Sequence, residues 1–161
     1  MTAPDPTMAD LAAAVDLGRA GERDAARRRL IAMWDDLGAD GDALHRCSVA
    51  HFLADLQDDV REELLWDERA LSAAQDLTDG RAQEHHAALF VRGLQPSLQL
   101  SLADDHRRLG DPVRAREHVA LAEAALDELP DDDYGRLIRS GVDLVREALA
   151  AGSTEPLPVV P

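Results

Sequence analysis

Lysine and asparagine are absent from the sequence, cysteine occurs once and aromatic residues make up only 3% of it, and these shortages exclude several classes of protein. Because Cys47 is the only cysteine, the chain cannot form an internal disulfide. No apolar run approaches the ~18 residues that a membrane-spanning helix needs. The N-terminus also lacks the basic start and apolar stretch of a secretion signal. We therefore expect a cytoplasmic protein.

Positive charge is scarce as well, since 17 arginines stand against 32 acidic residues and the net charge is −15. Nucleic acids and anionic membranes are bound through clustered cations. The one basic run, Arg27–Arg29, is too short to supply them, and its predicted place is the solvated side of a helix. We therefore expect neither a nucleic acid nor a membrane surface as a partner.

The abundant residues favour helices, because alanine, leucine, arginine and glutamate lose little side-chain freedom in them. Apolar residues recur every three to four positions, as at Val49, Phe52 and Leu53, and no segment is typical of a strand. We therefore predict an all-α fold with about eight helices, of which the fifth and sixth could also be one helix bent at Pro96. Their ranges are near residues 8–20, 22–37, 42–56, 59–76, 81–92, 96–109, 112–129 and 132–150.

Residues that start or stop a helix mark the breaks between these segments. The clearest break is Leu109–Pro112, where Gly110 suits a left-handed stop, Asp111 a cap of the next helix and Pro112 its first turn. By the same logic, Thr7, Asp42 and Asp58 are predicted to cap three other helices. The chain is thus predicted to consist of helices separated by turns.

Three segments share one spacing, in which an apolar residue, a small residue and a larger residue precede a turn that ends in an acid. Their small residues are Ala14, Ala50 and Ala103. The pattern resembles the tetratricopeptide repeat, in which a small residue lets two antiparallel helices approach closely and apolar residues seal the hairpin.

The resemblance covers residues 8–150 and implies an all-α stack of antiparallel helical hairpins. It implies about three hairpins, an inserted helix at 81–92 and a C-terminal capping helix. The small residues are 36 and 53 positions apart, whereas the family period is about 34, so the repeat is divergent and the inserted helix accounts for the extra length. Residues 1–7 are then an N-terminal extension, and residues 151–161 are a Pro-rich tail.

Trp34 and Trp66 are the only tryptophans of the chain, and both lie on the second helix of a predicted hairpin. A large ring at such a position most often fills the space between neighbouring hairpins. We therefore interpret both as core residues.

The resemblance also implies a concave groove, lined by the first helix of each hairpin. We expect this groove to bind a protein or a peptide, or a small polar ligand, with arginines facing acidic groups. No cofactor, bound metal or catalytic residue is expected. The predicted groove residues are Cys47, His51, Asp55, Asp104, Arg107 and Arg108, with Met8, Leu11, Val15 and Arg19 in the first helix.

Cys47, His51 and Asp55 leave a second hypothesis open, because a spacing of four places them on one face of a helix. A thiol, an imidazole and a carboxylate on one face could bind a metal or form an activated nucleophile. A small enzyme or metal-binding protein is therefore the alternative. The plainer interpretation is a buried cysteine, a hydrogen-bonded histidine and a solvated aspartate, and the lack of a second ligand pair with matching spacing favours it.

The tail offers a third hypothesis. Its prolines prevent a helix and favour an extended segment. Such a segment could dock on another copy of the chain and form a homo-oligomer.

Overall fold

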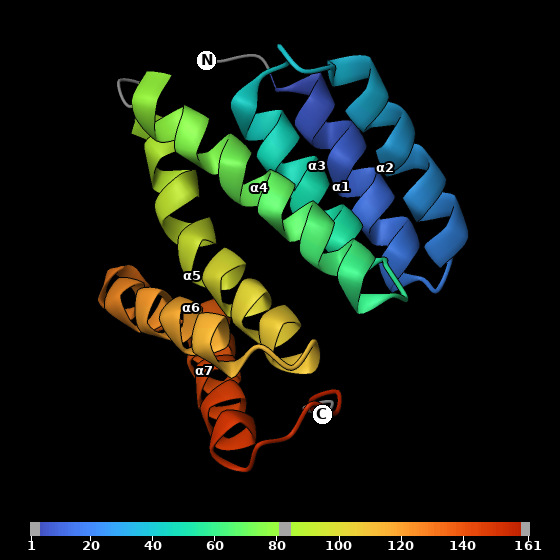
Figure 1. Ribbon diagram of the computed structural model, residues 1–161. Helices are drawn as coiled ribbons and strands as arrows, with labels where there is room; N and C mark the ends of the chain where they lie inside the picture. Colours follow the sequence, from blue (N-terminus) through green and yellow to red (C-terminus); the bar gives the residue numbers. More distant parts are fainter. Residues whose placement is uncertain (1–3, 81–84, 159–161) are drawn as a thin grey trace. The chain divides into compact units, whose positions relative to one another are not determined.

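The computed structural model describes residues 4–80 and 85–158, and within these ranges the chain is all-α, as predicted. The ranges contain seven α-helices and one turn of 3-10 helix, and neither contains a strand (Figure 1). None of the helices in them is long and apolar enough to cross a lipid bilayer. The chain divides into two compact units, a first unit of Met1–Arg81 and a second unit of Ala82–Pro161.

The first unit consists of two antiparallel pairs of helices (Figure 1). Helices α1 (Pro6–Arg19) and α2 (Arg23–Leu37) form one pair, and α3 (Ala43–Asp55) and α4 (Val60–Gly80) form the other. Helix α3 also contacts α1 and α2, so it lies at the centre of the unit. A helix that is surrounded by other helices buries more than one face. This explains why consecutive residues of α3, polar as well as apolar, are buried.

Alanine and leucine side chains form most of the core of the first unit. Ala14 and Ala50, two small residues of the shared spacing, are completely buried at 0% exposure. Small side chains bring helix axes close together, so the gaps between the axes are filled by leucines and by one tryptophan. The buried apolar residues include Leu11, Ala14, Ala26, Leu30, Val49, Ala50, Leu53, Trp66, Ala70, Ala74 and Leu77.

The helices of the first unit begin at carboxylates. Asp42 caps α3 as predicted, because its side chain accepts hydrogen bonds from two backbone amides of the first turn. The predictions for the other two caps were wrong by one or two residues. Asp5, rather than Thr7, caps α1 and accepts from the Thr7 amide at 2.9 Å. At α4, Asp59 rather than Asp58 accepts the amide two residues ahead, at 2.7 Å.

The second unit consists of α5 (His85–Arg108), α6 (Pro112–Ala125), the 3-10 turn η1 (Leu126–Glu128) and α7 (Asp133–Ala150). Helices α5 and α6 form an antiparallel pair, and α7 contacts both (Figure 1). The turn between α5 and α6 is as predicted: Gly110 has a positive φ of 81°, and Asp111 caps α6. The core includes Ala103, Ala115, Val119, Ala122, Val142, Val145 and Leu149.

Of the two alternatives for residues 81–109, separate helices or one helix through Pro96, the structure has the second, because α5 is continuous from His85 to Arg108. The first four residues of the predicted inserted helix lie outside the described ranges. A proline inside a helix removes a hydrogen bond and costs about 3 kcal/mol. Pro96 is fully buried here and is followed by the buried Leu98 and Leu102, whose packing offsets that cost.

The tail returns to its own unit over the residues that the structure describes. The backbone carbonyls of Ser153 and Glu155 accept hydrogen bonds from Arg107 of α5, at 2.7 and 2.8 Å. Leu157 packs against the apolar core of the second unit. The Ser153 amide also donates to the Ala148 carbonyl of α7 at 2.9 Å. The tail up to residue 158 is therefore held by Arg107 of α5, by this backbone hydrogen bond and by the apolar contact of Leu157.

Candidate functional site

A pocket of about 220 Å³ lies between α1, α2 and α3 of the first unit. Its lining is apolar except for three charged side chains, Arg19, Arg23 and Asp55, all of which are exposed to solvent. The pocket is thus an apolar hollow with charges at its mouth. It is lined by Ala14, Val15, Gly18, Arg19, Arg23, Leu30, Phe52, Asp55 and Leu56.

Gly18 leaves the room for this hollow. A Cβ atom at Gly18 would lie 3.4 Å from Leu56 Cδ2 and 3.7 Å from Ala26 Cβ, which are ordinary van der Waals distances. Alanine would therefore fit at this position, whereas a larger side chain would extend into the pocket. A larger side chain at position 18 can therefore fill the pocket while its Cβ atom makes only ordinary contacts.

The charges at the mouth are only loosely paired. Arg19 lies 3.9 Å from Asp16, with both side chains more than three-quarters exposed, and Arg23 lies 3.5 Å from Asp58. Exposed pairs at such distances contribute little to stability, so both guanidinium groups can exchange these partners for a ligand. The surrounding protein partly shields the Asp55 carboxyl from water and raises its pKa, which His51 and Arg23 oppose.

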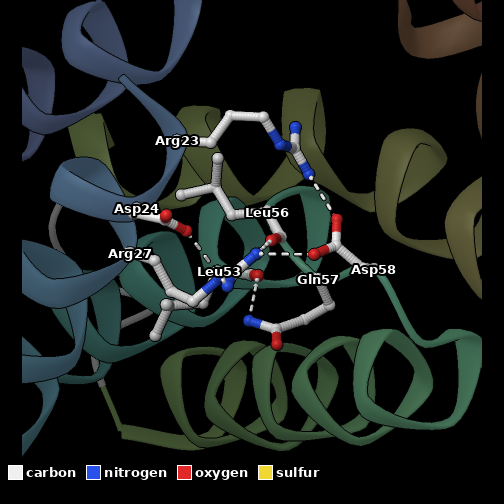
Figure 2. A network of polar contacts seen from close by, with 7 residues as sticks. All are labelled: Arg23, Asp24, Arg27, Leu53, Leu56, Gln57 and Asp58. Atoms are coloured by element: carbon white, nitrogen blue, oxygen red, sulfur yellow. Dashed lines mark hydrogen bonds and ion pairs between the residues drawn. The ribbon is translucent and has the colours of Figure 1, made fainter. Parts of the chain in front are cut away.

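Arg27 fixes the end of α3 beside the pocket (Figure 2). Its Nε and Nη2 atoms donate to the backbone carbonyl of Leu56, and the guanidinium also lies 3.5 Å from Asp24 and 3.4 Å from Asp58. The Gln57 side chain donates to the Leu53 carbonyl at 2.9 Å. These contacts satisfy carbonyls that the end of a helix leaves without partners, and they hold Leu56 in the pocket wall.

The prediction that Arg27–Arg29 lie on the solvated side of a helix is therefore correct only for Arg28, which is exposed. Arg29 is half-buried and its Nη2 atom lies 2.8 Å from Asp10 of α1, so it joins the first two helices. Consecutive residues of a helix point in directions about 100° apart, so a run of three arginines does not share one side.

The three groove residues predicted on α3 do not share one environment. Cys47 and His51 are buried, whereas Asp55 is exposed at the mouth of the pocket. Burial, and secondarily the charge of Asp67, raises the pKa of the Cys47 thiol to about 12. The thiol is thus protonated near neutral pH and is not an activated nucleophile. No ligand atoms of these three residues come within 4.8 Å of one another as a group.

His51 has an acidic partner in the core of the first unit. Its Nδ1 atom lies 3.4 Å from Oδ1 of Asp67 on α4, and both side chains are almost inaccessible to solvent. Burial lowers the pKa of His51, and the charge of Asp55 opposes this shift. His51 therefore joins α3 to α4, which agrees with the interpretation of a hydrogen-bonded histidine.

The three groove residues predicted on α5 lie in the second unit. Arg107 is buried and donates to Asp104 Oδ1 from Nε at 2.9 Å and from Nη2 at 2.6 Å, besides binding the tail. Arg108 lies 3.8 Å from Asp104 and 4.0 Å from Asp105. Since the two sets of groove residues belong to different units, their common surface stays a prediction.

A pair of histidines lies between α5 and α6. The rings of His106 and His118 are stacked, with centroids 5.3 Å apart and an angle of 3° between the ring planes. His118 Nδ1 lies 2.7 Å from the amide oxygen of Gln99. Burial, followed by the charge of His106, lowers the pKa of His118. The surroundings of His118 in the second unit therefore disfavour the protonated form of this imidazole.

We expect the free energy of unfolding to decrease as the pH falls from 7 to 5. His51 and His118 have lowered pKa values in the folded chain, whereas both titrate near 6.5 in the unfolded chain, which therefore binds more protons. Their contribution is fully present above about pH 6.5 and decreases as the pH falls from there towards the folded-state pKa of each histidine. Urea unfolding of the wild type and of His118→Gln at pH 7, 6 and 5 measures this. The free energy of unfolding should depend less steeply on pH in the variant than in the wild type. Equal slopes would contradict the prediction.

Sequence reasoning found part of the pocket. Val15 and Arg19 were predicted to line a groove and they line the pocket, whereas Leu11 is buried in the core. Gly18 and Phe52 were missed. The available signal was the spacing of Ala14 and Gly18, two small residues four positions apart on α1, which marks one face where a neighbouring helix approaches.

Comparisons of the chain with protein-family models, with curated proteins and with solved structures found no match.

Proposed function

We propose that the chain is a binding module for a protein or a peptide, built from helical hairpins of the tetratricopeptide kind. The observation that carries the proposal is the pocket of the first unit, which combines an apolar floor with two loosely paired arginines at its mouth. The complete burial of Ala14 and Ala50 within antiparallel helical pairs supports the hairpin assignment.

The size of the pocket favours one side chain as its occupant. Pockets for whole small molecules measure about 300–1,000 Å³, and this one measures about 220 Å³. An apolar side chain would be removed from water by Leu30, Phe52 and Leu56, and burial of such a side chain is worth about 1.5–3 kcal/mol. We therefore propose a peptide that inserts one apolar residue.

The charges at the mouth favour acidic neighbours of that residue. Arg19 and Arg23 offer planar sets of N–H donors that match carboxylates, and they outnumber the single acid of the lining, Asp55. The proposed ligand is therefore a segment in which an apolar residue stands beside acidic residues. A nucleophilic enzyme is less well supported, because the Cys47 thiol is protonated near neutral pH.

Filling the pocket should abolish binding without unfolding the protein. We expect peptides selected from a random display library on the wild-type chain to carry an apolar residue next to acids. Their affinity for Gly18→Leu should fall at least tenfold, because the leucine occupies the hollow. The Arg19→Gln/Arg23→Gln variant should also bind more weakly, and titration calorimetry measures both losses.

Arg28→Gln is the matched control, because it also removes an exposed positive charge from the first unit but does not line the pocket. Its affinity should equal that of the wild type, and circular dichroism should show unchanged helix content for all variants. Undiminished binding to Gly18→Leu would contradict the proposal.

A further inference from the structure

Two tryptophans and two arginines gather on one part of the first unit. The indoles of Trp34 on α2 and Trp66 on α4 meet edge to face, with centroids 5.2 Å apart and an angle of 87° between them. The guanidinium carbon of Arg46 lies 4.9 Å from the Trp34 centroid, and that of Arg69 lies 4.3 Å from the Trp66 centroid and 6.0 Å from the Trp34 centroid. We name these four side chains the Trp–Arg cluster.

The arginines of the cluster differ from most arginines of the chain in their partners. Many arginines of the described ranges lie within 4.0 Å of a carboxylate, as Arg27, Arg29 and Arg107 do. In the same ranges, no carboxylate lies that close to Arg46 or Arg69. Arg28, Arg61, Arg116 and Arg139 also lack such a partner among the described residues, so what distinguishes the cluster is that two such cations lie over adjoining indole rings. They make this part of the surface attractive to anions.

The cation–π contacts leave hydrogen-bonding capacity in the cluster. A guanidinium that lies over an indole is held by its charge, so its N–H groups still need acceptors. The Nε atom of Arg46 is buried and donates to no acceptor among the described residues, whereas its Nη atoms are not buried. An incoming carboxylate would therefore meet free N–H donors on a side chain that is already held in place.

Two exposed aliphatic side chains flank the cluster. Ile31 lies one turn before Trp34 on α2, and Leu65 precedes Trp66 and lies one turn before Arg69 on α4. Each is 39% exposed. Tryptophan and arginine are the residues that most often dominate binding energy in protein interfaces, particularly where apolar neighbours exclude water.

We propose that the Trp–Arg cluster is a docking site for an acidic segment of a partner protein. Its carboxylates would bind Arg46 and Arg69, and an apolar residue of the segment would cover Ile31 or Leu65. Charge complementarity selects this occupant over a second copy of the chain, since two copies of net charge −15 repel each other. None of these six side chains lines the pocket between α1, α2 and α3, so the two sites can be tested separately.

The cluster contains both tryptophans of the chain, so intrinsic fluorescence observes it directly. We compare the Stern–Volmer quenching constants of iodide and caesium at equal ionic strength, each divided by the constant of the same ion for free N-acetyltryptophanamide. We expect the normalised constant for iodide to be at least twofold larger than that for caesium. The negative net charge of the whole chain would favour the opposite order. A larger normalised constant for caesium in the wild type would overturn the proposal.

Variants assign the effect to the two arginines. Arg46→Gln/Arg69→Gln should lose the preference for iodide, and Arg46→Lys/Arg69→Lys should keep it, since the charge is retained. The Arg19→Gln/Arg23→Gln variant changes the net charge by the same amount as Arg46→Gln/Arg69→Gln, but it does so at the pocket. It should therefore keep the wild-type preference for iodide. A preference that persists in Arg46→Gln/Arg69→Gln would overturn the proposal, and circular dichroism identifies any variant that is unfolded.

Docking itself is tested with the peptide acetyl-Glu-Glu-Leu-Glu-Glu-amide, titrated at low salt while the tryptophan fluorescence is recorded. We expect saturable binding that weakens as salt is added. The peptide also fits the pocket, but neither tryptophan lines the pocket, so the fluorescence reports binding at the cluster. Binding measured in this way should be at least tenfold weaker for Arg46→Gln/Arg69→Gln and unchanged for Gly18→Leu. Equal binding of the corresponding lysine peptide, or full binding by Arg46→Gln/Arg69→Gln, would overturn the proposal.

Discussion

Replacing Arg107 with alanine is expected to lower the free energy of unfolding by about 3 kcal/mol or more, within the range of about 3–5 kcal/mol for breaking a buried ion pair. The Arg107 side chain is 1% exposed and its partner Asp104 is 20% exposed, so the loss should lie towards the lower end of that range. Alanine would leave the Asp104 carboxylate with only the longer contact to Arg108, at 3.8 Å. It would also leave the carbonyls of Ser153 and Glu155 without their donor.

The tail should be released in the same variant. Arg107 is the side chain of α5 that binds the residues before Leu157, so its loss should weaken the contact of Leu157 with the core of the second unit. We therefore expect the Arg107→Ala tail to be cleaved rapidly by a protease of broad specificity. Deleting residues 153–161 should likewise destabilise the protein. The combined change should cost less than the sum of the two, because both remove the same contacts.

The measurement is urea unfolding followed by circular dichroism, since both tryptophans lie in the first unit and would not report on the second. Arg146→Ala is the matched control. It removes an arginine from the same unit, and its ion pair with Glu123 at 3.1 Å is exposed, so the expected loss is about 0.2–1 kcal/mol. Similar small losses in Arg107→Ala and Arg146→Ala would show that the tail contributes little to the fold.

The sequence was sufficient for the features that depend on neighbours along the chain. The helical class, the cap at Asp42 and the turn at Gly110 and Asp111 follow from local spacing and from the chemistry of single residues. The burial of Ala14, Ala50 and Ala103 agrees with the spacing that they share. Where the sequence left two alternatives open, as at Pro96, the packing of the surrounding helix outweighed a breaking signal.

The arginines could not be predicted, and the reason is physical. Arg27 and Arg107 bind the backbone carbonyls of Leu56, Ser153 and Glu155, which are 29, 46 and 48 positions away from them. Every residue has a carbonyl, so a bond to one leaves no pattern in the sequence. Arg107 was predicted to face a ligand because its position on the helix was known and its burial was not. The pocket was found only in part for the same reason, since three helices enclose it.

Replacing Gly135 with alanine is expected to lower the free energy of unfolding by about 1–3 kcal/mol, the usual cost of overpacking. Helix propensity predicts the opposite sign, because alanine is favoured over glycine by about 1 kcal/mol inside a helix. Gly135 is buried in the first turn of α7, and a Cβ atom there would overlap the backbone carbonyl oxygen of Pro130. It would also lie 2.9 Å from Nη1 of Arg139.

Two further contacts oppose a shift of the backbone at this position. The Gly135 amide donates to the side chain of Asp132 at 2.8 Å, which caps the helix. Arg139 donates to the carbonyls of Leu126 and Leu129, both at 3.2 Å, so a shift of its side chain would disturb the turn that precedes α7. The added methyl group must therefore displace either the cap or this turn.

Gly18→Ala is the control that isolates the effect, because it makes the same change in α1 where a Cβ atom meets only ordinary contacts. It should be neutral or should raise the free energy of unfolding by up to about 1 kcal/mol. Urea unfolding followed by circular dichroism compares the two variants. Opposite signs would show that packing against the Pro130 carbonyl, and not helix propensity, decides the residue at position 135. A stabilised Gly135→Ala variant would mean that the start of α7 relaxes to accept the methyl group.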